Sequence, residues 1–263
     1  MNATRHVIGF VVKDILRSRW SIMNMVFYAA TTSGLFYLQA DATKVAISLA
    51  SLSLVFVPLV SLLFTSMYFY NSRSFVELIL TQPVSRLTVF VGLYAGIIVS
   101  LVAGLVVGVF VPYAAFGSFN STDVGALTAV MVIGVSLSAV FVGLAFLTAI
   151  RFDDRGKGLA VVLGVWLVAA IVYDGLVLAA ATAFSHYPLE TPLLAASLAN
   201  PVDLARVVFL VHSDMAALMG YTGAVFVRFF DQTAGLALAA ASMLVWTVAP
   251  LLFGLCRFRA KDF

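Results

Sequence analysis

Long runs of apolar residues alternate with short charged segments along this chain. Residues 45–70 and 87–122 contain no charged side chain. A run of about 20 apolar residues, at ~1.5 Å per residue in a helix, covers the hydrocarbon core of a bilayer. Similar runs recur along the chain, and the pattern predicts six membrane-spanning helices at residues 20–40, 45–70, 86–112, 124–150, 158–184 and 234–256. The predicted fold is an all-α polytopic membrane protein, with one transmembrane domain over residues 1–263.

The segment 71–86 is short, charged and amphipathic, and it lies between the second and third predicted spans. Its apolar residues recur at helical spacing, at Phe75, Leu78 and Ile79. The polar residues are left for water, and these are Arg73, Glu77 and Arg86. Pro83 is expected to end the helix, because proline lacks the N–H and crowds the preceding turn. A rigid helix between two spans can transmit a pull from a soluble partner to both.

Residues 4–19 predict an amphipathic helix that precedes the first span. Six apolar residues share one broad helical face, namely Val7, Ile8, Val11, Val12, Ile15 and Leu16, while His6, Lys13 and Arg17 cluster opposite. Low overall hydrophobicity with a basic polar face is typical of a helix that lies in the membrane interface. A frayed, positively charged tail is the alternative.

The basic residues are distributed unevenly between the two sides of the predicted bundle. With the N-terminus inside, twelve lie on the inner side, and only Lys44, Arg206 and Arg228 lie on the outer side. This positive-inside bias places both termini and the 71–86 helix in the cytoplasm, and residues 185–233 on the periplasmic side of an inner membrane. The net charge of +3 therefore follows topology, and nucleic acid is not an expected partner.

Composition and motifs argue against an enzyme. The chain is 63% hydrophobic and 10% charged, against about 25% charged in ordinary soluble domains. Its single cysteine, Cys256, excludes an internal disulfide framework and a cysteine-cluster metal site. The motif RGKG at 155–158 lacks the upstream Gly and the following Ser/Thr of a phosphate-binding loop, and no G-x-S-x-G nucleophile motif occurs.

One carboxylate interrupts a predicted span. Asp174 lies about 24 Å along the fifth helix, counted from Gly158, which is the outer third of the bilayer. A carboxylate at the bilayer centre costs about 2.5–3.5 kcal/mol on insertion scales, and less towards the interface. Asp174 could line an outward pathway; alternatively it is satisfied by a neighbouring helix or lies among the headgroups.

The outer segment 185–233 predicts a helix and suggests a metal site. Asn200 is a suitable N-cap, Pro201 a first residue, and Asp203 an acid in the first turn. If this helix continues, His212, Met215 and Met219 share one face, and thioether and imidazole suit copper. The alternative is that the methionines pack and the histidine is hydrated.

The third span carries two pairs of glycines at four-residue spacing, Gly92 with Gly96 and Gly104 with Gly108. Small residues at this spacing let helix backbones approach closely. They predict tight packing within one chain or, alternatively, a dimer seam.

Three sequence blocks carry a resemblance to a known family. Glu77, followed by an apolar run and TQPVSR at 81–86, resembles the coupling-helix region of type-2 (ABC-2) ABC transporter permeases. The blocks at 157–178, KGLAVVLGVWLVAAIVYDGLVL, and 200–208, NPVDLARVV, resemble the membrane subunit of the transporter that serves nitrous oxide reductase maturation. The similarity covers essentially the whole chain.

The resemblance implies a homodimer that carries two ATP-binding subunits, each docked on a coupling helix. ATP and Mg would be bound by those partners, with no cofactor in this chain. By the same analogy residues 4–19 are the elbow helix, residues 73–83 dock into a groove of the ATPase, and a periplasmic β-helical protein sits on the outer face. The ATPase-coupling residues implied in this way are Arg73, Phe75, Glu77, Leu78, Pro83 and Arg86. The pathway would deliver copper or a sulfur species to the reductase.

Three other functions fit parts of the pattern. One is an ABC-2 exporter of a lipid, peptide or drug; another is a secondary transporter or channel; the third is a membrane scaffold without transport. Membrane lipid is an expected partner in each case.

Overall fold

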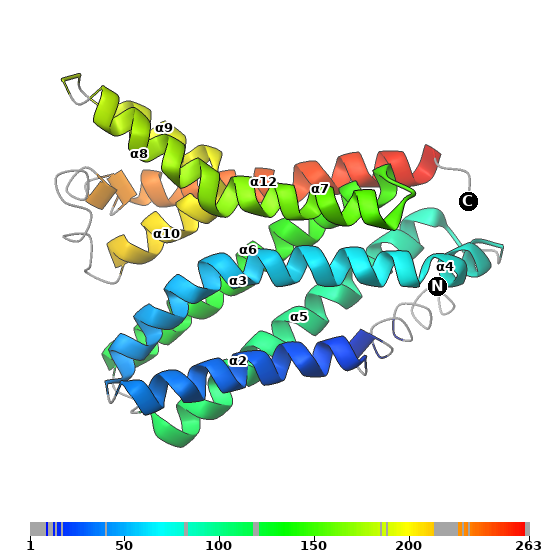
Figure 1. The fold of residues 1–263 in the computed structure, drawn as a ribbon, viewed down its shortest axis with the longest axis horizontal. Helices are drawn as coiled ribbons and strands as arrows, with labels where there is room; N and C mark the ends of the chain where they lie inside the picture. Colours follow the sequence, from blue (N-terminus) through cyan, green and yellow to red (C-terminus); the bar gives the residue numbers. More distant parts are fainter. Residues whose placement is uncertain are drawn as a thin grey trace.

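The chain is described by a computed structural model that covers residues 9, 13, 15–16, 18–39, 41–81, 84–117, 121–184, 186–187, 189–212, 226–227, 229–230 and 232–260. Its elements are α2 (Arg19–Leu38), α3 (Ala42–Asn71), α4 (Arg73–Leu80), α5 (Arg86–Phe116), α6 (Ser121–Arg151), α7 (Arg155–Leu167), the π-helix η1 (Val168–Val172), α8 (Tyr173–Ala183), α9 (Glu190–Ala199), α10 (Pro201–His212) and α12 (Thr233–Ala260). Within these ranges there is no strand, which confirms the all-α class (Figure 1).

Five helical stretches are long and apolar enough to cross a membrane: α3, α5, the part of α6 from Val124, the continuous stretch Arg155–Ala183, and α12. The bent pair α9–α10 would add a sixth if it counts as one span. The expected first span forms as α2, but it is not among the five. Its buried face is polar, made of Ser21, Asn24, Tyr28 and Thr32.

Helix α2 packs on α5 at two of the predicted glycines. A Cβ on Gly104 would lie 2.5 Å from Asn24 Nδ2, and one on Gly108 would lie 2.7 Å from Met25 O. Asn24 Nδ2 also donates to Leu101 O at 3.3 Å. This glycine pair therefore brings two backbones of the same chain together, which is the within-chain alternative above.

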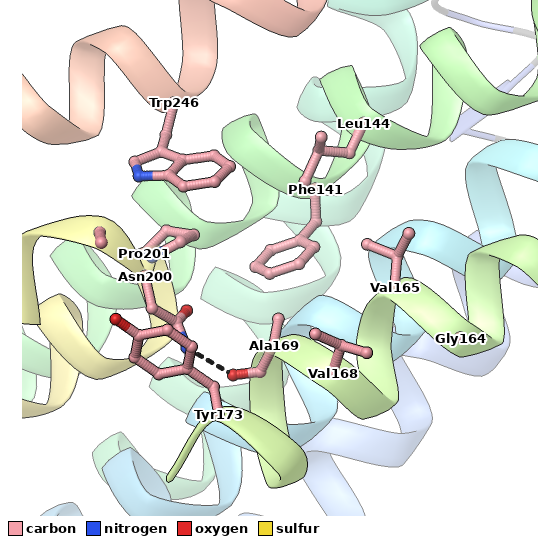
Figure 2. Close-up of a pocket in the computed structure, with 11 residues that line it drawn as sticks. Phe141, Leu144, Gly164, Val165, Val168, Ala169, Tyr173, Asn200, Pro201 and Trp246 are labelled. Carbon is pink, nitrogen blue, oxygen red and sulfur yellow. Dashed lines mark hydrogen bonds between the residues drawn. The ribbon is translucent and has the colours of Figure 1, made fainter. Parts of the chain in front are cut away.

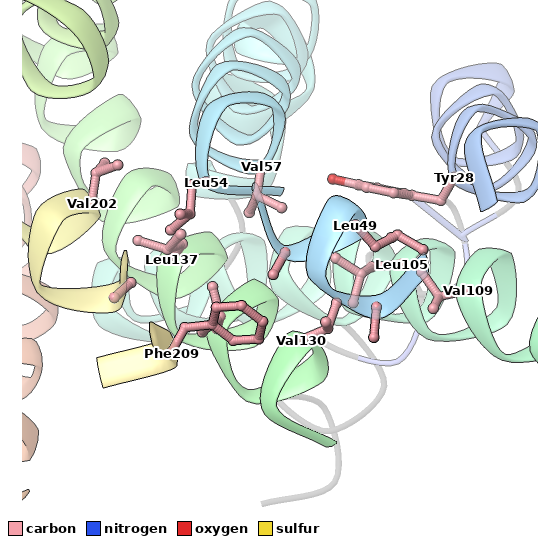
Figure 3. Packing of buried hydrophobic residues seen from close by; sticks show 14 of the residues in the cluster. Tyr28, Leu49, Leu54, Val57, Leu105, Val109, Val130, Leu137, Val202 and Phe209 are labelled. Atoms are coloured by element: carbon pink, nitrogen blue, oxygen red, sulfur yellow. The ribbon is translucent and has the colours of Figure 1, made fainter. Parts of the chain in front are cut away.

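The centre of the bundle lies where α3 crosses α6 (Figure 3). Leu54, Val57, Leu137 and Phe209 are buried there in one apolar cluster. Pro58 lies inside α3 and leaves the carbonyl of Leu54 without its helix donor. Trp166 Nε1 of α7 donates to the next carbonyl, Val55 O, at 3.0 Å. A neighbouring helix therefore supplies a hydrogen-bond donor beside the proline.

The ends of the bundle carry different elements. Helix α4, the start of α2 and the end of α12 lie at one end, while the end of α8 lies at the other (Figure 1). At the first end, Arg86 Nη1 donates to Arg259 O at 2.8 Å and joins α5 to α12.

The outer segment is more structured than the sequence indicated. Helix α10 begins at Pro201 as predicted, with Asn200 Oδ1 accepting from Val202 N at 3.0 Å. Helix α9, which was not predicted, precedes it, and the two meet at an angle of 118°. Val202 and Leu204 are buried, so α10 folds back into the bundle and does not lie on its surface.

Candidate functional site

Helix α4 follows α3 after a single residue, Ser72. The Ser72 N–H donates the last hydrogen bond of α3 to Tyr68 O at 2.8 Å. The Ser72 carbonyl accepts the first hydrogen bond of α4 from Val76 N at 2.9 Å. At the other end, Thr81 Oγ1 donates to Leu78 O at 2.7 Å, and α4 ends at Leu80. The predicted helix is present, while the predicted stop at Pro83 lies outside the described residues.

The inner face of α4 differs from the expected one. Val76 and Ile79 are buried, and they share a cluster with Phe69, Phe146 and Phe258. Phe75 packs partly buried against the same cluster, as expected, but Leu78 is 62% exposed. The spacing grouped Leu78 with Phe75 and Ile79, but the structure leaves Leu78 exposed while Ile79 is buried. Nearly every residue from Phe75 to Leu80 is apolar, so the pattern does not select one face.

Polar contacts attach α4 to the loop between α6 and α7. Arg73 lies 3.2 Å from Glu77 Oε1 and 3.1 Å from Asp153 Oδ1. These partly exposed ion pairs each contribute at most about 1 kcal/mol. Burial of Val76 or Ile79 contributes more, about 1.5–3 kcal/mol each. The apolar face therefore holds α4 in place, and the ion pairs orient it.

The end of α3 makes further contacts with the same loop. Tyr70 Oη donates to Phe152 O at 2.9 Å, and Arg155 Nη1 donates to Asn71 Oδ1 at 3.3 Å. A Cβ on Gly158 would overlap Tyr70 Oη, so the start of α7 lies directly against this tyrosine. Five charged residues lie between positions 151 and 157, but no local pattern predicted the contact of this loop with α4. Arg73 and Arg86 are bonded to protein where water was expected.

One stripe of α4 remains uncovered in this chain. Ser74, Leu78 and Thr81 are exposed, and Glu77 lies beside them with a half-exposed carboxylate. This stripe is therefore the part of α4 that a partner can reach.

Asp174 is paired with another helix. Its Oδ2 lies 2.5 Å from Arg206 Nη1 of α10, and the same nitrogen lies 3.6 Å from Asp203 Oδ1. This is the alternative in which a neighbouring helix satisfies the carboxylate, and a role in a pathway stays a prediction.

The bend between α9 and α10 is bonded to the π-helical turn η1. Asn200 Nδ2 donates to Ala169 O at 2.7 Å (Figure 2), and Tyr173 Oη donates to Ala196 O at 2.6 Å. A π-helical turn disturbs the regular i→i−4 pattern, and such turns are frequent at functional positions. These two hydrogen bonds join η1 and the first residue of α8 to the α9–α10 pair.

Two predicted features fall largely outside the described residues. Of the expected elbow helix at residues 4–19, Lys13 is exposed, and Ile15 is buried in the same cluster as Val76. Of the copper candidates, Met215 and Met219 are not described, and His212 is placed only as the last residue of α10. Across the described ranges, no group of three His, Cys, Asp or Glu residues could hold a metal ion.

Comparison with known proteins identifies the class. The chain belongs to the ABC-2 family of transporter proteins, whose family model matches residues 55–263. It is 25% identical over 240 residues to a protein named probable ABC transporter permease protein NosY from Stutzerimonas stutzeri, covering 80% of this chain and 82% of the relative. The same name is given to a Pseudomonas aeruginosa relative that is 26% identical over 235 residues, with 79% and 81% covered.

Proposed function

We propose that this chain is the non-catalytic membrane subunit of an ABC transporter, and that a separate ATPase subunit docks on α4. The observation that carries the proposal is the contrast between the two faces of α4. One face is fixed by Val76 and Ile79, while Leu78 is 62% exposed on the other. In the assembly two copies of the chain, in an inner membrane with both termini in the cytoplasm, bind two ATPase subunits that hold the ATP and Mg.

Movement of the ATPases would enter the bundle at α4 by two routes. The chain itself leads from α4 into α3 and α5. The Arg73–Asp153 ion pair adds a route into the α6–α7 loop. The helix that starts there continues into η1, where Ala169 O accepts from Asn200 at the bend of α9–α10. Packed interfaces with two stable arrangements could carry the change to the outer side.

Site-directed cross-linking tests this assignment. In a chain whose single cysteine is replaced, Cys256→Ser, a new cysteine at exposed Ser74 should cross-link to an ATPase subunit that co-purifies in a one-to-one ratio. A cysteine at Tyr37, which is 92% exposed near the opposite end of α2, is the matched control and should not react. A complex without ATPase would refute the proposal and favour a secondary transporter.

We also propose that the transporter acts in copper-site maturation of nitrous oxide reductase, with a periplasmic β-helical partner on the outer side. The support is the resemblance of residues 157–178 and 200–208, together with the shared name of the two relatives. An ABC-2 exporter of a lipid, peptide or drug is the alternative.

The copper role predicts a specific defect. Met215→Leu with Met219→Leu keeps the side-chain volume but removes the sulfur ligands, so copper loading of the reductase should fall. The measurement is the copper content of purified reductase from cells that carry the variant chain. Normal loading, with the variant present at the wild-type level, would eliminate these methionines as copper ligands.

A further inference from the structure

A cavity of about 400 Å³ lies between α6, α7, η1, α12 and the bend of α9–α10 (Figure 2). Its walls include Phe141, Val165, Val168 and Trp246. A volume of this size is within the usual range for small-molecule sites, which are concave and mostly apolar. The cavity is therefore large enough for part of a ligand.

Two polar side chains at the wall of this cavity, Asn200 and Tyr173, already have hydrogen-bond partners. Asn200 donates to Ala169 O and accepts from Val202 N, and the Tyr173 hydroxyl donates to Ala196 O. An ordered water needs two to four polar partners, and cavities lined by apolar groups stay dry or take apolar guests. The chemistry of the walls consequently favours a hydrocarbon occupant over water or an ion.

The cavity opens on the surface of the chain, beside exposed apolar side chains. Gly164, Val168 and Ala199 line it and are exposed. Apolar side chains next to its rim on the same helix are also exposed: Leu163 at 43%, Leu167 at 46% and Ile171 at 53%. These residues belong to the stretch Arg155–Ala183, which is long and apolar enough to span a membrane, so a lipid tail is a neighbour of matching chemistry.

We propose that this cavity binds an acyl chain of a bilayer lipid. The proposal requires only that the chain spans a membrane, and it is independent of the assignment of α4. An acyl chain in the cavity would pack beside the Asn200–Ala169 hydrogen bond and keep water from it. The bound lipid would thus stabilise the contact between η1 and the bend of α9–α10.

Trp246 provides a reporter, because its indole lines the cavity. The full-length chain, purified in detergent with the subunits that accompany it, is titrated with phosphatidylcholine brominated along its acyl chains, and tryptophan emission is recorded. The expected result is saturable quenching that excess unbrominated phosphatidylcholine reverses. The saturable part should disappear in Trp246→Phe, which leaves Trp20, Trp166 and any tryptophan of the partners as background.

A large side chain introduced into the cavity should prevent the lipid from binding. A Cβ built on Gly164 or on Gly175 meets no heavy atom within 4 Å, but only Gly164 lines the cavity. Gly164→Phe should weaken the saturable quenching by about tenfold or more, the loss expected when a few methylene groups are no longer buried. Gly175→Phe is the matched control and should bind as the wild type does.

Ala199→Leu, at the same rim, gives a second filling variant if Gly164→Phe does not fold. Loss of saturable quenching in a folded filling variant, with Gly175→Phe unchanged, supports the proposal. Quenching that never saturates, or that is equal in the filling variants and the control, overturns it. Efficient disulfide formation between two copies carrying Val168→Cys would also overturn it, because a second chain would then cover the cavity.

Discussion

Leu78→Asp is expected to reduce ATPase binding, and with it transport-coupled ATP hydrolysis, by roughly 10- to 100-fold. A buried apolar anchor at the centre of an interface contributes about 2 kcal/mol or more, and each 1.4 kcal/mol is tenfold in affinity. Because Leu78 is 62% exposed and makes no part of the described core, the chain itself should fold normally. The measurement is the ATPase rate of the reconstituted complex, with the amount of ATPase retained on the purified chain.

Tyr37→Asp is the control for this experiment. It also places a carboxylate on an exposed apolar position, but near the far end of α2, away from α4. Its ATPase rate should equal that of the wild type. If Leu78→Asp also retained full binding and full coupled activity, α4 would not be the ATPase contact.

A large loss of stability is expected for Gly108→Leu. Even a Cβ at this position would lie 2.7 Å from both Met25 O and Tyr28 Cβ, so α2 must move away from α5. Overpacking of this kind costs about 1–3 kcal/mol and more where backbone is displaced. We expect the Tm of the purified chain to fall by several degrees and its yield in the membrane to decrease.

Gly34→Leu is the matched variant for this test. Gly34 belongs to α2 as well, but a Cβ there meets no heavy atom within 4 Å. Its Tm should stay close to that of the wild type. Equal Tm values for Gly108→Leu and the wild type would contradict the close approach of the two helices.

The helical class and most elements could be predicted because uncharged apolar runs have few other solutions in a membrane. The start of α10 was also predictable, since Asn200 and Pro201 are local capping signals. The buried side of α4 could not be predicted, because its eight residues contain apolar side chains on more than one face. Its partner Asp153 lies 80 residues away in sequence from Arg73, and no local pattern records that contact.

Helix α9 and the π-helical turn η1 were not predicted, for a different reason. Helix α9 is only ten residues long, too short to give a membrane signal by itself. The π-helical turn at Val168–Val172 is a change of hydrogen-bond pattern that leaves hydropathy unaltered. Its link to Asn200 depends on the 118° bend, which is a property of tertiary packing.

The two connections of α4 differ in length, and this has a consequence for timing. One residue, Ser72, separates α4 from α3, whereas Thr81 to Ser85 separate it from α5. A tilt imposed on α4 passes to α3 through one residue, whereas five residues of the chain lie between α4 and α5. The second span should therefore respond first, and the third with a lag.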